Sequence, residues 1–200
     1  MNTKIYQATI ISFLMPVVSS LFAIYMPGVE PTFNLLIIII FAANIVSYLA
    51  MLAIFPKRKR QNAARLTIAI NMLMFCLFFT FPMLKALMGT LWLQFLLIVI
   101  FLLLLVLAVK DQKKDIPLVF PGDKKEHRKL AFLFYAIPVM IILLGGGGNI
   151  IIVRELTNFI GDGFVTYWGG ALLYCLGCWL AFFFQSLFYK GFIKDGVLVK

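Results

Sequence analysis

The chain has 200 residues, of which 63% are hydrophobic and 13% charged, and its formal net charge is +10. A soluble domain has about 25% charged residues, and about half of its residues are apolar. This composition therefore excludes an ordinary soluble protein and indicates an integral membrane protein, although the excess of positive charge needs its own explanation.

Six apolar segments are each long enough to cross a bilayer as a helix, which takes about 20 residues. No segment alternates apolar and polar residues as a membrane β-strand does, and a lipid-exposed backbone must satisfy its own hydrogen bonds. We predict an all-α polytopic bundle in one transmembrane domain, 1–200. Its spans are residues 5–26, 32–55, 66–84, 91–109, 130–153 and 163–189.

The first span, 5–26, shares some features with a secretory signal peptide, because Lys4 precedes the apolar stretch and Val18-Ser19-Ser20 has the small residues of a cleavage site. Its apolar run exceeds the roughly 7–15 residues of a signal peptide, so we expect the span to be retained. Cleavage would leave five spans.

The loop at 56–65 holds a basic cluster without an acidic partner. Each basic group near anionic lipid is worth about 1 kcal/mol of attraction, so contact with lipid headgroups, or with a partner, explains the cluster. Nucleic-acid binding is not expected, because no domain is left to carry base-reading groups. The cluster comprises Lys57, Arg58, Lys59, Arg60 and Arg65.

Three amides, Asn44, Asn71 and Gln94, lie well inside the second, third and fourth spans. Amides at this depth form interhelical hydrogen bonds of about 0.6 kcal/mol each, or else they line a polar cavity. We expect the first role and keep the second as the alternative. A short turn near Lys85 follows the third span, and we place Lys85 outside the membrane there.

The loop at 110–129 has seven basic and four acidic residues around an apolar insert, 116–122, which contains Phe120. Two prolines in the insert prevent a regular helix. We expect the insert either to dip into lipid headgroups or to dock a partner. His127, the one histidine of the chain, lies in the same loop, and we expect it to be solvated.

The fifth apolar segment, 130–153, contains a run of small residues that predicts a break in the helix. Glycine costs a helix roughly 1 kcal/mol relative to alanine, and Pro138 adds a kink upstream. We predict a cavity or a re-entrant segment here, and a flexible outer loop is the alternative. The run is Gly145, Gly146, Gly147, Gly148 and Asn149.

The sixth span contains Cys175 and Cys178 in a C-x-x-C spacing that some thiol oxidoreductases use. Cys175 lies eleven residues after Phe164, about 16 Å at 1.5 Å per residue, near the bilayer centre, where a thiolate is unfavourable. We therefore do not expect redox chemistry. Close spacing on one face predicts a helix-packing seam made of Gly170, Gly177 and Ala181.

Sixteen of the eighteen Lys and Arg residues fall on one side of the six spans, and only Lys85 and Arg154 fall on the other. Short loops rich in Lys and Arg remain in the cytoplasm. We therefore predict that both termini and the loops 56–65 and 110–129 are cytoplasmic in a cell membrane. The positive charge is then a signal for topology.

No catalytic, metal-binding or cofactor-binding constellation is visible in the sequence, so we do not expect an enzyme. Six spans with both ends inside is a layout that small bacterial permease components share, and a permease or transporter subunit without its own ATPase is our first hypothesis. Its partners would be anionic lipid headgroups and a cytoplasmic ATPase or another membrane subunit. The alternatives are an accessory, immunity or regulatory protein that acts by association and, third, a membrane-embedded enzyme.

Overall fold

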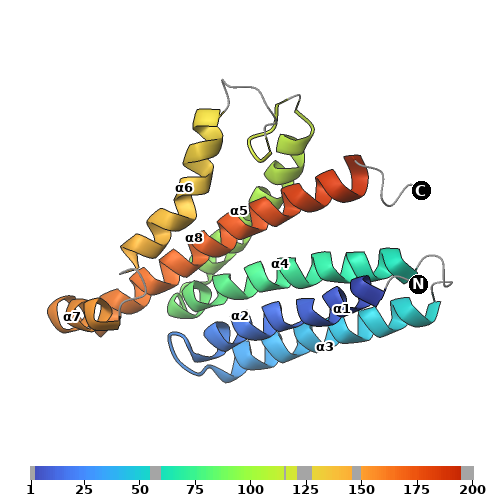
Figure 1. Cartoon of the computed structure of the whole chain (residues 1–200). Helices are drawn as coiled ribbons and strands as arrows, with labels where there is room; N and C mark the ends of the chain where they lie inside the picture. Colours follow the sequence, from blue (N-terminus) through green and yellow to red (C-terminus); the bar gives the residue numbers. More distant parts are fainter. Residues whose placement is uncertain (1–2, 55–59, 115, 121–127, 146–149, 195–200) are drawn as a thin grey trace.

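The computed structural model describes residues 3–54, 60–114, 116–120, 128–145 and 150–194 (Figure 1). Each regular element in this part of the chain is a helix. The elements in chain order are α1 (Thr3–Ser12), α2 (Leu14–Tyr25), α3 (Pro31–Ile54), α4 (Arg60–Ala86), α5 (Leu91–Gln112), α6 (Arg128–Leu144), α7 (Ile150–Ile160), α8 (Asp162–Phe188) and the π-helical segment η3 (Tyr189–Lys194).

Five stretches of helix in the described residues are long and apolar enough to cross a membrane. They are Gln7–Tyr25, Pro31–Ile54, Asn62–Ala86, Leu91–Gln112 and Asp162–Gly191. The structure thus supports an all-helical protein with several membrane-crossing helices. The fifth predicted span, at 130–153, differs, because α6 has 17 residues. At 1.5 Å per residue these cover about 26 Å, slightly less than a hydrocarbon core of about 30 Å.

The first membrane-crossing stretch consists of two helices, α1 and α2, which meet at Phe13. Pro16 explains the interruption, since proline has no N–H to donate to the carbonyl of Ser12, four residues earlier. The hydrogen bonding tightens by one residue there, because the Phe13 N–H donates to the carbonyl of Ile10, three residues earlier, at 3.2 Å. The chain continues in nearly the same direction (Figure 1).

Helix α4 lies at the centre of the fold and contacts α1, α2 and α3 on one side and α8 on another. Two clusters of buried side chains form the core on these sides. The first joins α2, α3 and α4 and includes Ala23, Ile37, Met74, Phe78, Phe81 and Leu84. The second joins α4, α5 and α8 and includes Cys76, Phe101, Tyr174, Cys178 and Ala181.

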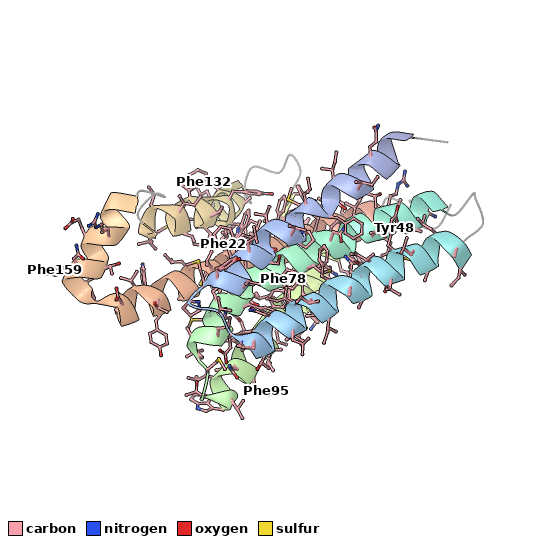
Figure 2. All side chains as sticks on the ribbon, turned by 90° about the horizontal axis from the view of Figure 1, so that it is seen from below. Phe22, Tyr48, Phe78, Phe95, Phe132 and Phe159 are labelled. Carbon is pink, nitrogen blue, oxygen red and sulfur yellow. The ribbon has the colours of Figure 1, made fainter. Side chains whose placement is uncertain are left out.

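The main contact of α6 is with α8, and α7 also packs against α8. Trp179 on α8 stacks on Phe134 of α6 with 5.3 Å between ring centroids, and its indole N–H donates to the Phe134 carbonyl at 2.8 Å. Figures 1 and 2 show α7 lying crosswise to α8. Helix α6 is therefore held to the bundle mainly through one neighbour.

The two ends of the bundle differ in what they carry. Helix α1 begins and α8 finishes at one end, which we call the terminal end, and α7 lies at the other, the far end (Figure 1). The far end also holds the finish of α2 and the starts of α5 and α8. The exposed Tyr and Trp residues at these three places are Tyr25, Trp92, Tyr167 and Trp168. Exposed Trp and Tyr at one level are typical of a membrane interface.

Two charged residues that we placed in loops are instead helical and buried, which corrects the sequence analysis. Lys85 lies in the last turn of α4 and Asp111 in the last turn of α5, each 5% exposed. The helices continue past the apolar segments because both charged groups find partners in neighbouring backbone. The sequence shows where the hydropathy of each segment falls. The helix itself ends further on, where its backbone and side-chain groups no longer find hydrogen-bond partners.

Candidate functional site

The ammonium group of Lys85 reaches across to the C-terminal end of α2. It donates hydrogen bonds to the carbonyls of Ala23 and Ile24, both at 2.9 Å, and to that of Gly28. The last carbonyls of a helix lack partners within the helix and carry partial negative charge, so a cation is favourable there. Lys85 therefore joins α4 to α2 and stabilises the fold.

Asn44 and Asn71 are buried and bonded to each other. The Asn44 amide group donates from Nδ2 to Asn71 Oδ1 at 2.5 Å, and Asn71 Nδ2 donates to Ser12 Oγ at 2.7 Å. The Ser12 hydroxyl in turn donates to the Thr9 carbonyl at 2.6 Å. This chain of bonds joins α3, α4 and α1, and its amides are used for contacts between helices.

Gln94 lies in a different place, at one side of an apolar groove of about 590 Å³ between α3, α4, α5 and α8. Its amide Nε2 donates to the Leu84 carbonyl at 2.8 Å. The other polar groups in the lining, Thr80 and Tyr174, also bond to backbone carbonyls, of Leu77 at 2.7 Å and Leu97 at 2.6 Å. These side chains already donate to backbone, and the other described residues of the lining are apolar.

A second groove of about 820 Å³ lies between α2, α6 and α8, and we call it the α2–α6–α8 groove. Helix α8 forms its longest wall, and Phe79 of α4 also lines it. The indole N–H of Trp168 donates to the Leu144 carbonyl at 3.2 Å. The described residues that line it are Phe22, Met26, Phe79, Ile141, Ile142, Leu144, Gly145, Ile160, Phe164, Val165, Trp168, Gly169, Leu172, Leu173 and Leu176.

The glycine run is only partly described. Gly145 follows α6 directly and lines the α2–α6–α8 groove, whereas Gly146, Gly147, Gly148 and Asn149 lie outside the described residues. Helix α6 ends at Leu144 and α7 begins at Ile150, so the 130–153 segment is not one continuous helix. A groove thus lies beside the first residue of the run, and whether the chain re-enters the membrane there stays a prediction.

The predicted packing seam on α8 lies against α4. A Cβ atom built on Gly177 would meet the Cys76 carbonyl oxygen at 2.8 Å, and one on Gly170 would meet the Met83 Cα at 3.2 Å. Ala181 is fully buried in the same cluster. Small residues here let the two backbones approach more closely than larger side chains would allow.

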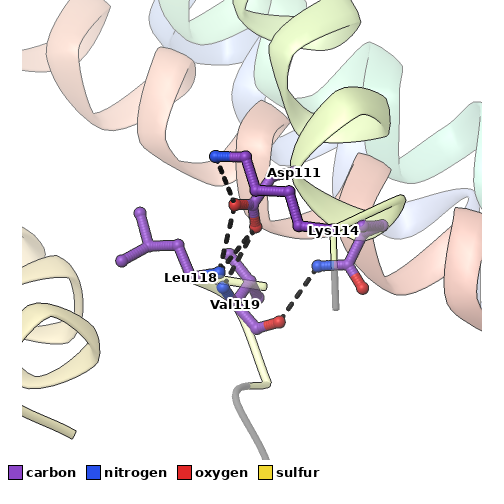
Figure 3. Close-up of polar contacts among 5 residues, drawn as sticks. Asp111, Lys114, Leu118 and Val119 are labelled. Atoms are coloured by element: carbon purple, nitrogen blue, oxygen red, sulfur yellow. Dashed lines mark hydrogen bonds and ion pairs between the residues drawn. The ribbon is translucent and has the colours of Figure 1, made fainter. Parts of the chain in front are cut away.

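The apolar insert after α5 folds back onto its own chain (Figure 3). The Asp111 carboxylate accepts hydrogen bonds from the Leu118 N–H at 2.9 Å and from the Val119 N–H at 3.3 Å. Gln112 Nε2 donates to the Val119 carbonyl at 3.0 Å. A charged group that accepts from backbone amides makes the stronger kind of hydrogen bond, so the described part of the insert is fixed.

Phe120 is half-buried and takes a left-handed backbone conformation, with φ of 63°. Its ring lies 5.6 Å from that of Phe183 on α8, between centroids, and the Lys190 ammonium lies 5.2 Å from the Phe120 centroid. The sequence pointed to Phe120 but missed Asp111 and Gln112. The available signal was a carboxylate and an amide at the end of an apolar helix, directly before a proline-containing insert.

The predicted basic cluster and the cysteines add little to these sites. Lys57, Arg58 and Lys59 lie outside the described residues, Arg60 begins α4, and Arg65 is half-buried on it. Cys178 is buried and Cys175 exposed. Within the described ranges no group of three or more His, Cys, Asp or Glu residues is placed to hold a metal ion, and His127 lies outside them.

Comparison of the chain with models of known protein families, with curated proteins and with solved structures finds no match.

Proposed function

We propose that the chain is the membrane subunit of a permease that works with a separate ATPase, with the terminal end of the bundle in the cytoplasm. The observation that carries this proposal is the α2–α6–α8 groove of about 820 Å³. A protein that acts only by association is expected to have a closely packed bundle. A groove within the usual size range of ligand sites, about 300–1,000 Å³, favours a protein that binds and moves something.

The helices that form the walls of this groove differ in how closely they pack against the rest of the bundle. Helix α8 is locked to α4 along Gly170 and Gly177, where an added Cβ would meet backbone atoms of α4. Helix α6 has its main contact with α8 and finishes beside Gly145, at the start of the glycine run. A movement of α6 relative to α2 therefore breaks fewer side-chain contacts than a movement of α4 relative to α8. Such a movement of α6 would change the width of the groove.

The fixed insert after α5 supports a docking role at the terminal end. Asp111 and Gln112 hold Leu118 and Val119 in place, so the described part of the insert has a defined shape before any partner arrives. Ordering a loop in advance lowers the entropy cost of association. We infer that the surface around Phe120 is where the ATPase binds.

Replacing Asp111 by alanine tests this proposal, because it removes the acceptor of the Leu118 and Val119 amides. The chain would be purified in mild detergent from its native membrane, and the ATP-hydrolysing protein recovered with it would be measured. We expect recovery to fall by about tenfold, the equivalent of about 1.4 kcal/mol of binding. Wild-type chain that is recovered alone would contradict the permease proposal and favour an accessory or regulatory protein.

The matched control is Lys114→Ala. Lys114 is exposed, and its ammonium lies 3.6 Å from an Asp111 carboxylate oxygen. Such exposed ion pairs contribute about 0–1 kcal/mol. Partner recovery with this variant should therefore equal that of the wild type, whereas an equal loss in both variants would point to charge and not to the shape of the insert.

A further inference from the structure

The chemistry of the α2–α6–α8 groove selects against water-soluble ligands. Each side chain in its described lining is apolar apart from the indole of Trp168, whose N–H already donates to the Leu144 carbonyl at 3.2 Å. A hydrated solute would lose its hydrogen bonds to water in this groove and gain none from these side chains. An apolar chain loses no hydrogen bonds there.

The length of the groove matches one leaflet of a bilayer. Its lining on α8 runs from Phe164 to Leu176, a separation of twelve residues. At 1.5 Å per residue this is about 18 Å, close to half of a hydrocarbon core of about 30 Å. A groove of this length along a membrane-crossing helix accommodates one extended acyl chain.

The position of the groove places its mouth at the far end of the bundle. Phe164 and Trp168 stack there with ring centroids 6.2 Å apart, and Ile160 of α7 also lines the groove. Helix α7 is too short to span, lies crosswise to α8, and exposes Arg154 and Glu155 as well as Phe159, which is 90% exposed. A short helix with charged and exposed apolar residues suits the headgroup region of a membrane.

We propose that the α2–α6–α8 groove binds one acyl chain of a membrane amphiphile whose headgroup lies level with α7. The substrate class of the permease is then a lipid-like molecule that enters sideways from the leaflet at the far end. The transport of this molecule rests on the proposed function, but its binding does not. Lipid supplies the occupant directly, since the groove lies along a membrane-crossing helix.

Two glycines on α8 allow this site to be blocked with a matched control. A Cβ on Gly169, which lines the groove, would meet nothing within 4 Å, and the same holds for Gly163, which is not in the lining. Neither substitution disturbs existing packing at the Cβ position. Gly169→Phe therefore fills the groove, whereas Gly163→Phe adds the same ring to the same helix outside it.

The experiment uses the full chain in vesicles of phosphatidylethanolamine and phosphatidylglycerol that contain a phospholipid with a photoreactive diazirine on its acyl chain. After illumination, labelled peptides of α6 and α8 are quantified by mass spectrometry. We expect Gly169→Phe to lower labelling of the groove residues by about fivefold, the equivalent of about 1 kcal/mol, and Gly163→Phe to leave it unchanged. Equal labelling in all three proteins would overturn the proposal, because it would mean ordinary contact with bulk lipid.

A second variant guards against loss of fold. Gly169→Leu adds a smaller side chain to the same position, and thermal unfolding of each variant is measured in parallel. Reduced labelling in a variant that unfolds at the wild-type temperature supports the site. Selective labelling without any co-purifying ATPase would leave this inference standing and remove the permease. A co-purifying ATPase together with equal labelling of the wild type and the variants would leave the permease proposal standing and remove the acyl-chain site.

Discussion

Replacing Gly177 by leucine is expected to force α4 away from α8 and to lower the free energy of unfolding by about 3 kcal/mol. The Cβ alone would lie 2.8 Å from the Cys76 carbonyl oxygen and 3.1 Å from the Phe79 Cβ. These atoms are backbone or next to backbone, so no side-chain rotation can make room. The measurement is unfolding in detergent micelles by a denaturing detergent, followed by circular dichroism.

The control for Gly177→Leu is Gly163→Leu, also on α8, where an added Cβ meets nothing within 4 Å. Both variants replace glycine by a better helix former, so the difference between them isolates the contact with α4. The first variant should be strongly destabilised and the second little changed. Similar stability of the two would show that α4 and α8 do not approach as closely as described.

Replacing Lys85 by methionine is expected to lower the free energy of unfolding by about 3 kcal/mol. Methionine keeps an apolar stem of similar length but removes the ammonium that donates to the carbonyls of Ala23, Ile24 and Gly28. Those carbonyls would be left without this donor in a region where Lys85 itself is 5% exposed. The measurement is thermal unfolding of the purified protein in detergent.

Lys113→Met provides the comparison for this variant. Lys113 is exposed at the end of α5, and exposed substitutions of this kind usually change stability by less than about 0.5 kcal/mol. A large effect at Lys85 with a small one at Lys113 fits a lysine that bridges α4 and α2. If Lys85→Met unfolds at the wild-type temperature, the ammonium does not support the end of α2.

The membrane-crossing helices were predictable because a segment's ability to cross a membrane depends on its length and its apolar composition. Both can be read directly from the sequence. The exception is the segment 130–153, whose apolar residues continue through the glycine run while the α6 helix ends at Leu144. A hydropathy average does not register that break. The glycine run in the sequence did predict the break, because glycine pays the largest entropy cost in a helix.

The partners of buried polar groups were not predictable from spacing within one span. Lys85 bonds to carbonyls about sixty residues earlier in the chain, and Asn71 donates to Ser12 across a similar separation. Such pairs arise only when the helices pack. By contrast, the small residues Gly170 and Gly177 share one face of one helix, so their periodicity indicated a close contact without naming α4.

The α2–α6–α8 groove also could not be read from the sequence, since its walls come from segments that are far apart in the chain. Gly145 was singled out for breaking a helix, and it does lie in the lining. Gly169 and Leu172 gave no signal, because an apolar residue in an apolar span looks alike whether it faces lipid, core or a groove. Which residues line the groove depends on which part of the α8 surface the neighbouring helices leave uncovered.

Transfer of a fluorescent phospholipid from one leaflet to the other tests this account most directly. It is measured in vesicles that contain the chain purified together with its ATP-hydrolysing partner. We expect ATP-dependent transfer that Gly169→Phe lowers by about tenfold and Gly163→Phe leaves unchanged. Transfer no faster than in protein-free vesicles, or equal in the two variants, would contradict the claim that this groove is the working site of a transport subunit.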